Sequence, residues 1–307
     1  MDFQHVRSFL AIADELHFGR AATKIHISQP SLSQQLRRLE RHVGVELVAR
    51  TSHEVRLTAA GEAFYVEAKR FIRQAERAIA AARDAAAGRS GTINIGFNLS
   101  AAERVLHPAL LELGTTHPGV TTHLREQGGG PQMKGLLNGD LDVGFMFGPP
   151  SVDGLCSREV VVGVRLVAVV GKHHEWAGRD AVGFPELATR SCLLCRRETS
   201  PAMHNAVLAA AQRTNTTLRI GAEVDDPGAA WLLVTTQPIA GIASLERARA
   251  MNGTVLVPII EPRLTLSVHA VWRPPMTSLV AALLDIVDAM PAPPAATSRA
   301  RGATTAA

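Results

Sequence analysis

The fold of this chain is decided by the stretch Phe18-Gly-Arg-Ala-Ala-Thr-Lys-Ile-His-Ile-Ser28-Gln29-Pro30-Ser31-Leu-Ser33-Gln34-Gln35-Leu-Arg37-Arg38-Leu-Glu40. Its pattern predicts two short helices around a tight turn. The segment behind it, Arg50-Thr51-Ser-His-Glu-Val-Arg56-Leu-Thr58, predicts a basic hairpin. An α-helix fits the major groove of DNA when its N-terminus carries short polar side chains for base edges and phosphates. The second of these helices offers such side chains, so we interpret the segment as a DNA-reading domain.

The neighbouring sequence completes a small helical domain. Apolar residues at helical spacing predict a first helix over about residues 3–16, and an alanine-rich second helix follows over residues 19–27. Ser28 is a good N-cap for the third helix, and Pro30 is tolerated in a first turn, where an amide hydrogen has no partner. We expect this third helix to run to about His42 and to stop at Gly44.

A longer helix is predicted from Thr58 to the glycine at position 88. Small and aromatic residues recur in it at alternating spacings of four and three, which is typical of a two-helix seam; they are Phe64, Ala68, Phe71, Ala75, Ala78, Ala82 and Ala85. The stripe could instead pack on the core of its own domain. We favour dimerisation, because a groove-reading helix gains affinity and register when it is doubled on a palindromic site.

After Gly91 the pattern changes to strands that alternate with helices, which implies a mostly parallel sheet with helices on its faces. We expect two α/β lobes, with chain crossings near Pro149-Pro150 and near Glu261-Pro262. Residues 264–290 would return to the first lobe. The tail over residues 291–307 is rich in Ala, Pro, Ser and Thr, and is expected to be disordered.

Composition narrows the class of protein further. The 307 residues carry a net charge of +4. All of it falls in residues 1–89, where fourteen Lys or Arg face ten Asp or Glu, which suits contact with phosphates. The sequence shows no secretory signal and no apolar run long enough for a membrane span. Three cysteines are too few for a disulfide framework, and we therefore expect a cytoplasmic protein.

Four motifs in the first 61 residues resemble the winged helix-turn-helix of LysR-type transcriptional regulators. They are Phe9-Leu-Ala-Ile-Ala, Phe18-Gly-Arg-Ala-Ala, Ile27-Ser28-Gln29-Pro30-Ser31-Leu-Ser33-Gln34-Gln35-Leu and Arg56-Leu57-Thr58-Ala59-Ala60-Gly61. The resemblance implies an α/β protein with an all-α winged helix-turn-helix at its N-terminus and a two-lobed effector domain like periplasmic binding proteins. The implied ranges are 1–58 for DNA binding, 59–89 for the dimerising linker helix and 90–290 for the effector domain. Lobe I would hold about 90–161 and 264–290, and lobe II about 162–263.

The resemblance also implies which residues meet double-stranded DNA. Base edges would be contacted by Gln29, Pro30, Ser33 and Gln34, and the backbone by Ser31, Arg37, Arg50, Thr51 and Arg56. Gln can pair with adenine, and Arg with guanine or phosphate. The family usually has Phe at the position of Val48, and this difference is expected to change the packing under the basic hairpin, the wing of the domain.

A small-molecule inducer would bind between the lobes. The matching positions at strand ends are Asn98, Ser100, Gly129, Gly130, Arg196 and Thr199. Hydroxyls, backbone amides and one guanidinium could hold a carboxylate, so the resemblance implies a small anionic metabolite. One departure is Gln237-Pro238-Ile239, where the family usually has a Gly-x-Gly turn, and the second lobe therefore offers a different inner surface.

Other motifs have simpler interpretations. Cys192 and Cys195 could form a redox switch, but residues three apart on a strand point to opposite faces, so we expect one of them in the core. His173-His174-Glu175 fits a solvated loop better than a metal site. Gly128-Gly129-Gly130 lacks the Lys and Ser or Thr of a phosphate loop, which leaves a ligand contact or a plain turn.

We predict a homo-oligomeric DNA-binding regulator, an activator rather than a repressor, which needs no cofactor or metal and has RNA polymerase as a partner. The alternatives are an enzyme with catalytic lobes and a structural DNA organiser without a ligand. Residues 90–307 show no catalytic triad spacing, nucleophile elbow or metal set, which disfavours the enzyme.

Overall fold

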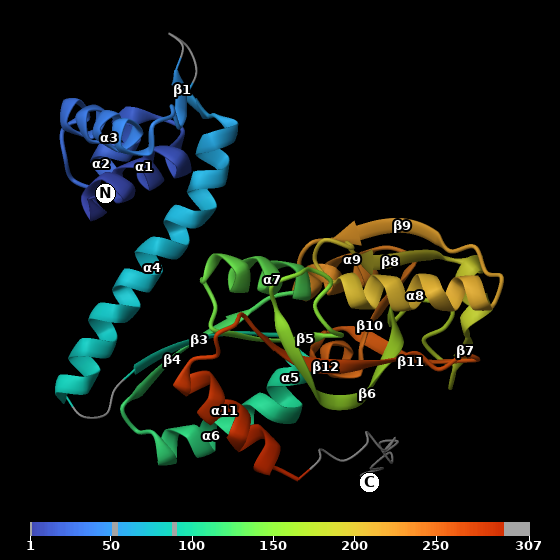
Figure 1. Cartoon of the computed structure of the whole chain (residues 1–307). Helices are drawn as coiled ribbons and strands as arrows, with labels where there is room; N and C mark the ends of the chain where they lie inside the picture. The colour runs from blue at the N-terminus through green and yellow to red at the C-terminus, as the bar shows by residue number, and fades with distance from the viewer. Residues whose placement is uncertain (1, 51–54, 88–90, 292–307) are drawn as a thin grey trace. The chain divides into compact units, whose positions relative to one another are not determined.

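The computed structural model describes residues 2–50, 55–87 and 91–291 of the chain, in two compact units (Figure 1). The first unit holds helices α1 to α4 and a two-stranded hairpin, and the second holds every element from β3 to α11. The predicted fold class, a winged helix-turn-helix followed by a two-lobed α/β domain, is confirmed. The tail predicted over residues 291–307 lies, except for its first residue, outside the described residues.

Three helices form the core of the first unit: α1 (Phe3–Glu15), α2 (Phe18–Lys24) and α3 (Gln29–Val43). The Ser28 hydroxyl caps α3 by accepting a hydrogen bond from the Ser31 amide at 3.3 Å, and Gly44 ends it in a left-handed conformation with φ of 85°. The second helix stops three residues earlier than the sequence predicted, because the backbone leaves the helical region at Ile25.

The wing is the hairpin of β1 (Val48–Arg50) and β2 (Val55–Leu57), which pair in antiparallel register. Hydrogen bonds connect the start of the hairpin to α3, because Glu40 Oε1 accepts from the amides of Leu47 and Val48, at 3.0 and 3.2 Å. Val48, where the family usually has Phe, is buried in the core of this unit. The wing is therefore held by both a charged group and apolar packing.

Helix α4 spans Ala59–Ala87, the range that the sequence predicted, and the Thr58 hydroxyl accepts a hydrogen bond from the Gly61 amide at 2.9 Å at its start. Phe64 and Ala68 of the predicted seam pack on their own domain, where the ring of Phe64 lies 5.2 Å from that of Phe9. Farther along the helix Phe71, Ala78 and, beside the seam, Ile79 are exposed, and the ring of Phe71 also lies 6.2 Å from that of Phe3 in α1. The seam thus divides into a part used by the domain and a part open to a partner.

Lobe I is one half of a continuous sheet in which β3 pairs in parallel with both β4 and β5, and β12 pairs antiparallel with β5 and β6. Helices α6 and α11 lie side by side on it and share its core (Figure 1). Its elements are β3 (Gly91–Phe97), α5 (Leu99–Ala101), the π-helix η1 (Ala102–Leu106), α6 (His107–Thr116), β4 (Val120–Glu126), α7 (Gly129–Asn138), β5 (Val143–Phe147), β6 (Cys156–Gly171), β12 (Thr265–Trp272) and α11 (Ser278–Ala289).

Lobe II continues the same sheet through β6, with β10 and β11 antiparallel to it and β8 parallel to both β10 and β9. Its elements are β7 (Val182–Gly183), the 3-10 turn η2 (Phe184–Thr189), β8 (Ser191–Cys195), α8 (Pro201–Arg213), β9 (Arg219–Val224), the 3-10 turn η3 (Pro227–Ala229), α9 (Ala230–Thr236), β10 (Ile239–Ser244), α10 (Leu245–Ala250) and β11 (Thr254–Ile260).

The sequence suggested a first crossing between the lobes near Pro149-Pro150, but the structure has this crossing elsewhere. It falls inside β6, where Arg165 still pairs with Thr265 of lobe I and Leu166 already pairs with Ser244 of lobe II. The proline pair marks only a bend before this strand. The second crossing falls between Ile260, where β11 ends in lobe II, and Thr265, where β12 begins in lobe I.

Two further local differences concern helices of lobe I. The helical segment that follows β3 contains the π-turn η1, which widens the backbone where Arg104 is held. The glycine triplet is not a free loop, because Gly129 and Gly130 form the first turn of α7. Among the described residues, none of the helices is long and apolar enough to span a membrane.

Candidate functional site

The recognition helix α3 has one buried and one exposed face. Leu32, Leu36 and Leu39 fill the core of the first unit. Of the residues predicted to meet DNA, Gln29, Pro30, Gln34 and Arg37 are exposed, and Ser31 and Ser33 are half-buried. Because the leucines fix the rotation of the helix, these polar side chains are presented together on the side that faces away from the core.

The exposed face of α3 continues into a basic patch that the sequence prediction left out. Arg38, Arg41 and His42 are all exposed near the end of the helix. Cationic side chains near a helix C-terminus interact favourably with its dipole, and they can also neutralise phosphates. Their spacing on the same helix as Arg37 was the signal that could have found them.

The wing contributes one described cation. Arg56 on β2 is exposed, opposite Ala49 in the hairpin register. Arg50 is the last residue of β1, but the structure does not describe its side chain, and Thr51 lies outside the described residues. The predicted roles of Arg50 and Thr51 on the DNA backbone therefore stay predictions.

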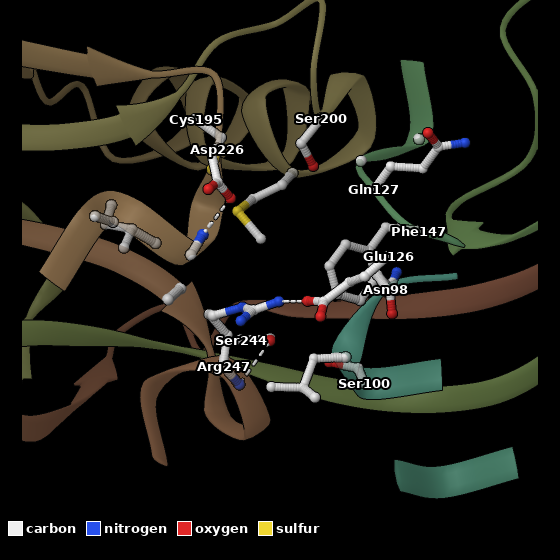
Figure 2. Close-up of a pocket in the computed structure, with 18 of the residues that line it drawn as sticks. Asn98, Ser100, Glu126, Gln127, Phe147, Cys195, Ser200, Asp226, Ser244 and Arg247 are labelled. Atoms are coloured by element: carbon white, nitrogen blue, oxygen red, sulfur yellow. Dashed lines mark hydrogen bonds and ion pairs between the residues drawn. The ribbon is translucent and has the colours of Figure 1, made fainter. Parts of the chain in front are cut away.

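The second unit contains a cavity of about 350 Å³ that is lined from both lobes. Its wall is largely apolar, as small-molecule sites usually are, with Leu99, Phe147, Leu193, Cys195, Met203, Ala230, Ile242, Ala243 and Met251. Figure 2 shows the polar side chains that interrupt this wall. They are Asn98, Ser100, Glu126, Gln127, Ser200, Asp226, Ser244 and Arg247.

Asn98 and Ser100 both line the cavity, but each already has a partner. The Asn98 side chain caps α5 by accepting a hydrogen bond from the Ala101 amide at 2.9 Å. The Ser100 hydroxyl is buried and donates to Glu246 Oε2 at 2.8 Å. Glu246 also accepts from Arg104, at 2.8 Å from Nε and 2.7 Å from Nη2. Ser100 therefore offers a ligand only its oxygen lone pairs.

The glycine segment divides between cavity and lobe contact. Gly128 and Gly129 line the cavity, whereas Gly130 is buried and its amide is already bonded to the other lobe. Thr199 provides the accepting carbonyl and is itself buried outside the cavity lining. Arg196 is exposed, lies outside the lining, and has its Nε 3.6 Å from Asp225 Oδ1. Gly130, Thr199 and Arg196 are thus not brought together with Asn98 and Ser100.

Six polar lining residues were missed from the sequence: Glu126, Gln127, Ser200, Asp226, Ser244 and Arg247. Glu126 ends β4, Ser244 ends β10, Asp226 caps the turn η3, and Arg247 lies in α10. The strand-end signal of Asn98, a polar residue at the end of a buried strand, applies to Ser244 but not to Glu126 or Asp226, because β4 and β9 (Arg219–Val224) are largely exposed. Ser244 stands two positions after the apolar segment Ile239-Ala-Gly-Ile, whereas Arg247 lies in the following helix and carried no such signal.

The two cysteines of β8 are both buried, one in the core and one at the cavity. Cys192 belongs to the core of lobe II, as one of the pair was expected to, and Cys195 lines the cavity. Burial raises the pKa of both thiols to about 11, with the negative charge of Asp226 adding to the effect at Cys195. Protonated, buried thiols react slowly, which argues against a redox switch here.

Comparison with known proteins agrees with this architecture. Residues 3–62 match the family model described as bacterial regulatory helix-turn-helix protein, lysR family, and residues 86–291 match the LysR substrate binding domain. The chain is 32% identical over 275 residues to the uncharacterized HTH-type transcriptional regulator YnfL of Escherichia coli, covering 89% of this chain and 92% of that protein. It is 33% identical over 204 residues to the regulator AlsR of Bacillus subtilis, covering 66% and 67%.

Solved structures of similar proteins match nearly the whole chain. CbnR, a LysR family transcriptional regulator, superposes with a TM-score of 0.76 at 25% identity, over 94% of this chain and 98% of that one. Full-length CbnR in complex with its target DNA gives a TM-score of 0.74 at 25% identity, over 94% and 99%. These relatives are regulators rather than enzymes. With both of its domains matched, the chain belongs to the LysR family of DNA-binding transcriptional regulators.

Proposed function

We propose that this regulator activates transcription when a small anionic metabolite binds the cavity between lobes I and II. The observation that carries the proposal is the lining itself, which takes Asn98 and Glu126 from lobe I and Asp226 and Arg247 from lobe II. A ligand that touches both lobes stabilises the arrangement of the lobes to which it binds best. Activation is the commoner role in the family, and an activator would contact RNA polymerase.

On DNA the regulator would act as an oligomer in the cytoplasm. A single α3 presents few base contacts, so two copies on a palindromic site would supply the affinity and register that one lacks. The exposed part of α4, with Phe71, Ala78 and Ile79, is the surface we assign to this pairing. The ligand would then change the spacing of the paired α3 helices through the lobes.

The DNA-reading half of the proposal is tested with sites selected from random duplexes by the full chain. We expect Ser33→Ala and Arg37→Ala to weaken binding, and Arg37→Ala to reduce the slope of log affinity against log salt by about 1, because one phosphate contact is lost. Lys134→Ala removes an exposed charge of the effector domain and is the matched control. Unchanged gel-shift binding by both α3 variants would contradict the assignment.

The ligand-sensing half is tested by filling the cavity. Leu99 is half-buried at the cavity wall, so Leu99→Trp places an indole in the space that a ligand would use. We expect this variant to keep its affinity for DNA and to lose the thermal stabilisation that small carboxylates and aromatic acids give the parent chain. It should also lose metabolite-dependent activation of a reporter gene. A variant that responds like the parent would overturn the role of the cavity.

A further inference from the structure

Among the described residues that line the cavity, one is a cation, and it already holds an anion from the opposite lobe. Arg247 extends from α10 of lobe II and forms an ion pair with Glu126 at the end of β4 in lobe I (Figure 2). Both side chains line the cavity. The pair therefore lies where a ligand would have to bind, and it connects the two lobes across that space.

The two partners differ in their access to water. The side chain of Arg247 is 19% exposed, whereas that of Glu126 is 44% exposed. Burial lowers the pKa of Arg247, against the opposing influence of Glu103, although a guanidinium stays charged at any physiological pH. A buried charge is costly unless an anion compensates it. Arg247 thus needs an anion, while Glu126 can be hydrated without one.

We propose that Glu126 is an internal substitute for the effector, and that the effector is a monocarboxylate with an apolar body whose carboxylate replaces Glu126 on Arg247. This inference rests on the proposed function of the cavity. The exchange keeps Arg247 paired throughout and releases Glu126 to solvent. It also replaces a direct ion pair between the lobes by contacts that both lobes make with the ligand.

The rest of the lining limits the charge of the ligand. Asp226 also faces the cavity and accepts a hydrogen bond from the Gly228 amide at 2.7 Å. Within the described part of the lining, the charged residues are thus two carboxylates and one guanidinium, and a second negative charge on the ligand would meet Glu126 and Asp226 without a cation of its own. Asp226 is exposed, so water can solvate its carboxylate and a positive charge on the ligand is not required to compensate it.

The apolar part of the lining determines the body of the ligand. Phe147, Met203 and Ile242 come from separate elements of the two lobes and enclose the same space as Arg247. Burying an apolar chain there contributes about 25 cal/mol for each Å² removed from water. Charge recognition at Arg247 and apolar burial beside it together favour aliphatic or arylalkyl acids over small hydrophilic acids.

Two matched series of probes test the proposal on the full chain by titration calorimetry at constant ionic strength. One consists of hexanoate, hexanamide, butylmalonate and norleucine, and the other of phenylpropanoate, phenylpropanamide, benzylmalonate and phenylalanine. Within a series the body is constant, and the charge changes from one negative to none, to two negative, and to a zwitterion. We expect the monoanions to bind most tightly.

Substitutions at the pair separate exchange from a purely structural clamp. Glu126→Gln should tighten monoanion binding by about two- to five-fold, because a half-exposed competitor is removed. Arg247→Gln should weaken it by about ten-fold or more, because charge-assisted hydrogen bonds are lost. Arg247→Lys keeps the positive charge, so its affinity for the monoanion should lie between those of Glu126→Gln and Arg247→Gln. Glu112→Gln and Arg249→Gln, both at exposed positions, are the charge-matched controls.

A structural clamp would instead change affinity in the same direction for Glu126→Gln and Arg247→Gln, and that result would overturn the proposal. So would an amide, dianion or zwitterion that binds more tightly than its monoanion, or two series that do not bind at all. If the series fail while Leu99→Trp still abolishes the metabolite response, only this inference falls. If Leu99→Trp responds normally, the proposed function itself falls.

Discussion

The amide of Gly130, in the first turn of α7, donates a hydrogen bond of 3.1 Å to the carbonyl of Thr199 and so joins lobe I to lobe II by backbone alone. A side chain would not fit at this contact: a Cβ on Gly130 would lie 1.7 Å from the carbonyl oxygen of Glu198. At the neighbouring Gly128 the distance to the Thr199 oxygen would be 2.2 Å. The glycines that resembled a ligand loop are needed for close approach of the two lobes.

Gly130→Ala should therefore separate the lobes at this point. The added methyl group meets backbone rather than a flexible side chain, and we expect a loss of about 1–3 kcal/mol in the free energy of unfolding, as for other overpacked sites. Urea denaturation of the full chain measures it. Gly114→Ala is the control, because a Cβ there meets nothing within 4 Å and alanine favours the interior of α6. Equal stability of the two variants would contradict the close contact.

The buried cluster of Ser100, Arg104 and Glu246 is expected to couple the lobes more strongly than the exposed ion pairs do. The side chains of Arg104 and Glu246 are 9% and 4% exposed. Removing one partner leaves a buried charge uncompensated, so Glu246→Met should cost about 3–5 kcal/mol. The double variant Arg104→Met with Glu246→Met should be more stable than Glu246→Met alone, since two apolar side chains replace the pair. A double-mutant cycle in urea gives the coupling, and additive effects would argue against it.

The three cysteines should differ sharply in reactivity. Cys156 is exposed, whereas Cys192 and Cys195 are buried with pKa values raised to about 11. We expect iodoacetamide to modify Cys156 alone in the native chain at neutral pH, and all three cysteines after denaturation, as peptide mass spectrometry would show. Modification of Cys195 at the rate of Cys156 would mean that the cavity opens readily.

The same thiols predict a pH dependence of stability. Their pKa in the folded chain, about 11, lies above the usual value of 9.0, so the native state holds more protons than the unfolded state between these limits. The stabilisation is complete below about pH 9.0 and is lost as the pH rises toward 11. Cys192→Ala should flatten this decline relative to the parent chain, and Cys156→Ser should leave it unchanged.

Oligomerisation through α4 is testable with a pair of identical substitutions. Ala78 is exposed on the predicted seam, and Ala80 lies about 200° around the helix from it at about 100° per residue. We expect Ala78→Glu to weaken self-association, because a charge would enter the seam, and Ala80→Glu to leave it unchanged. Sedimentation velocity distinguishes the two, and equal behaviour would remove α4 as the interface.

Local signals made most of the first unit predictable. Ser28 and Gly44 bound α3 because capping depends on the few residues around each end. The apolar spacing of the three leucines determines which face is exposed, and with it the position of Gln29 and Arg37. Helix α2 was predicted too long because Ile25 is apolar and continues the pattern, although its backbone does not continue the helix.

Pairing between distant segments made the second unit harder to predict. Pro149 and Pro150 suggested a crossing because proline interrupts strands, but the crossing depends on which partners β6 finds on either side of Arg165. In the cavity, Asn98 was predictable from its place after a strand. Ser100 and its acceptor Glu246 are 146 positions apart, and no local pattern indicates that distance. Arg247 was missed because the exposed side of the short α10 depends on what it packs against.

Strand β6 runs without a break through both lobes, and this makes lobe II an insertion that cannot be removed as a cassette. Cutting the chain between Arg165 and Leu166 and again between Ile260 and Thr265 would divide one strand between the two pieces. One part of β6 would stay paired with β12, and the other with β10 and β11, so each lobe would lose the strand continuity that joins it to the other. Chimaeras that exchange effector specificity within this family should therefore carry both lobes together, with their joints placed in α4.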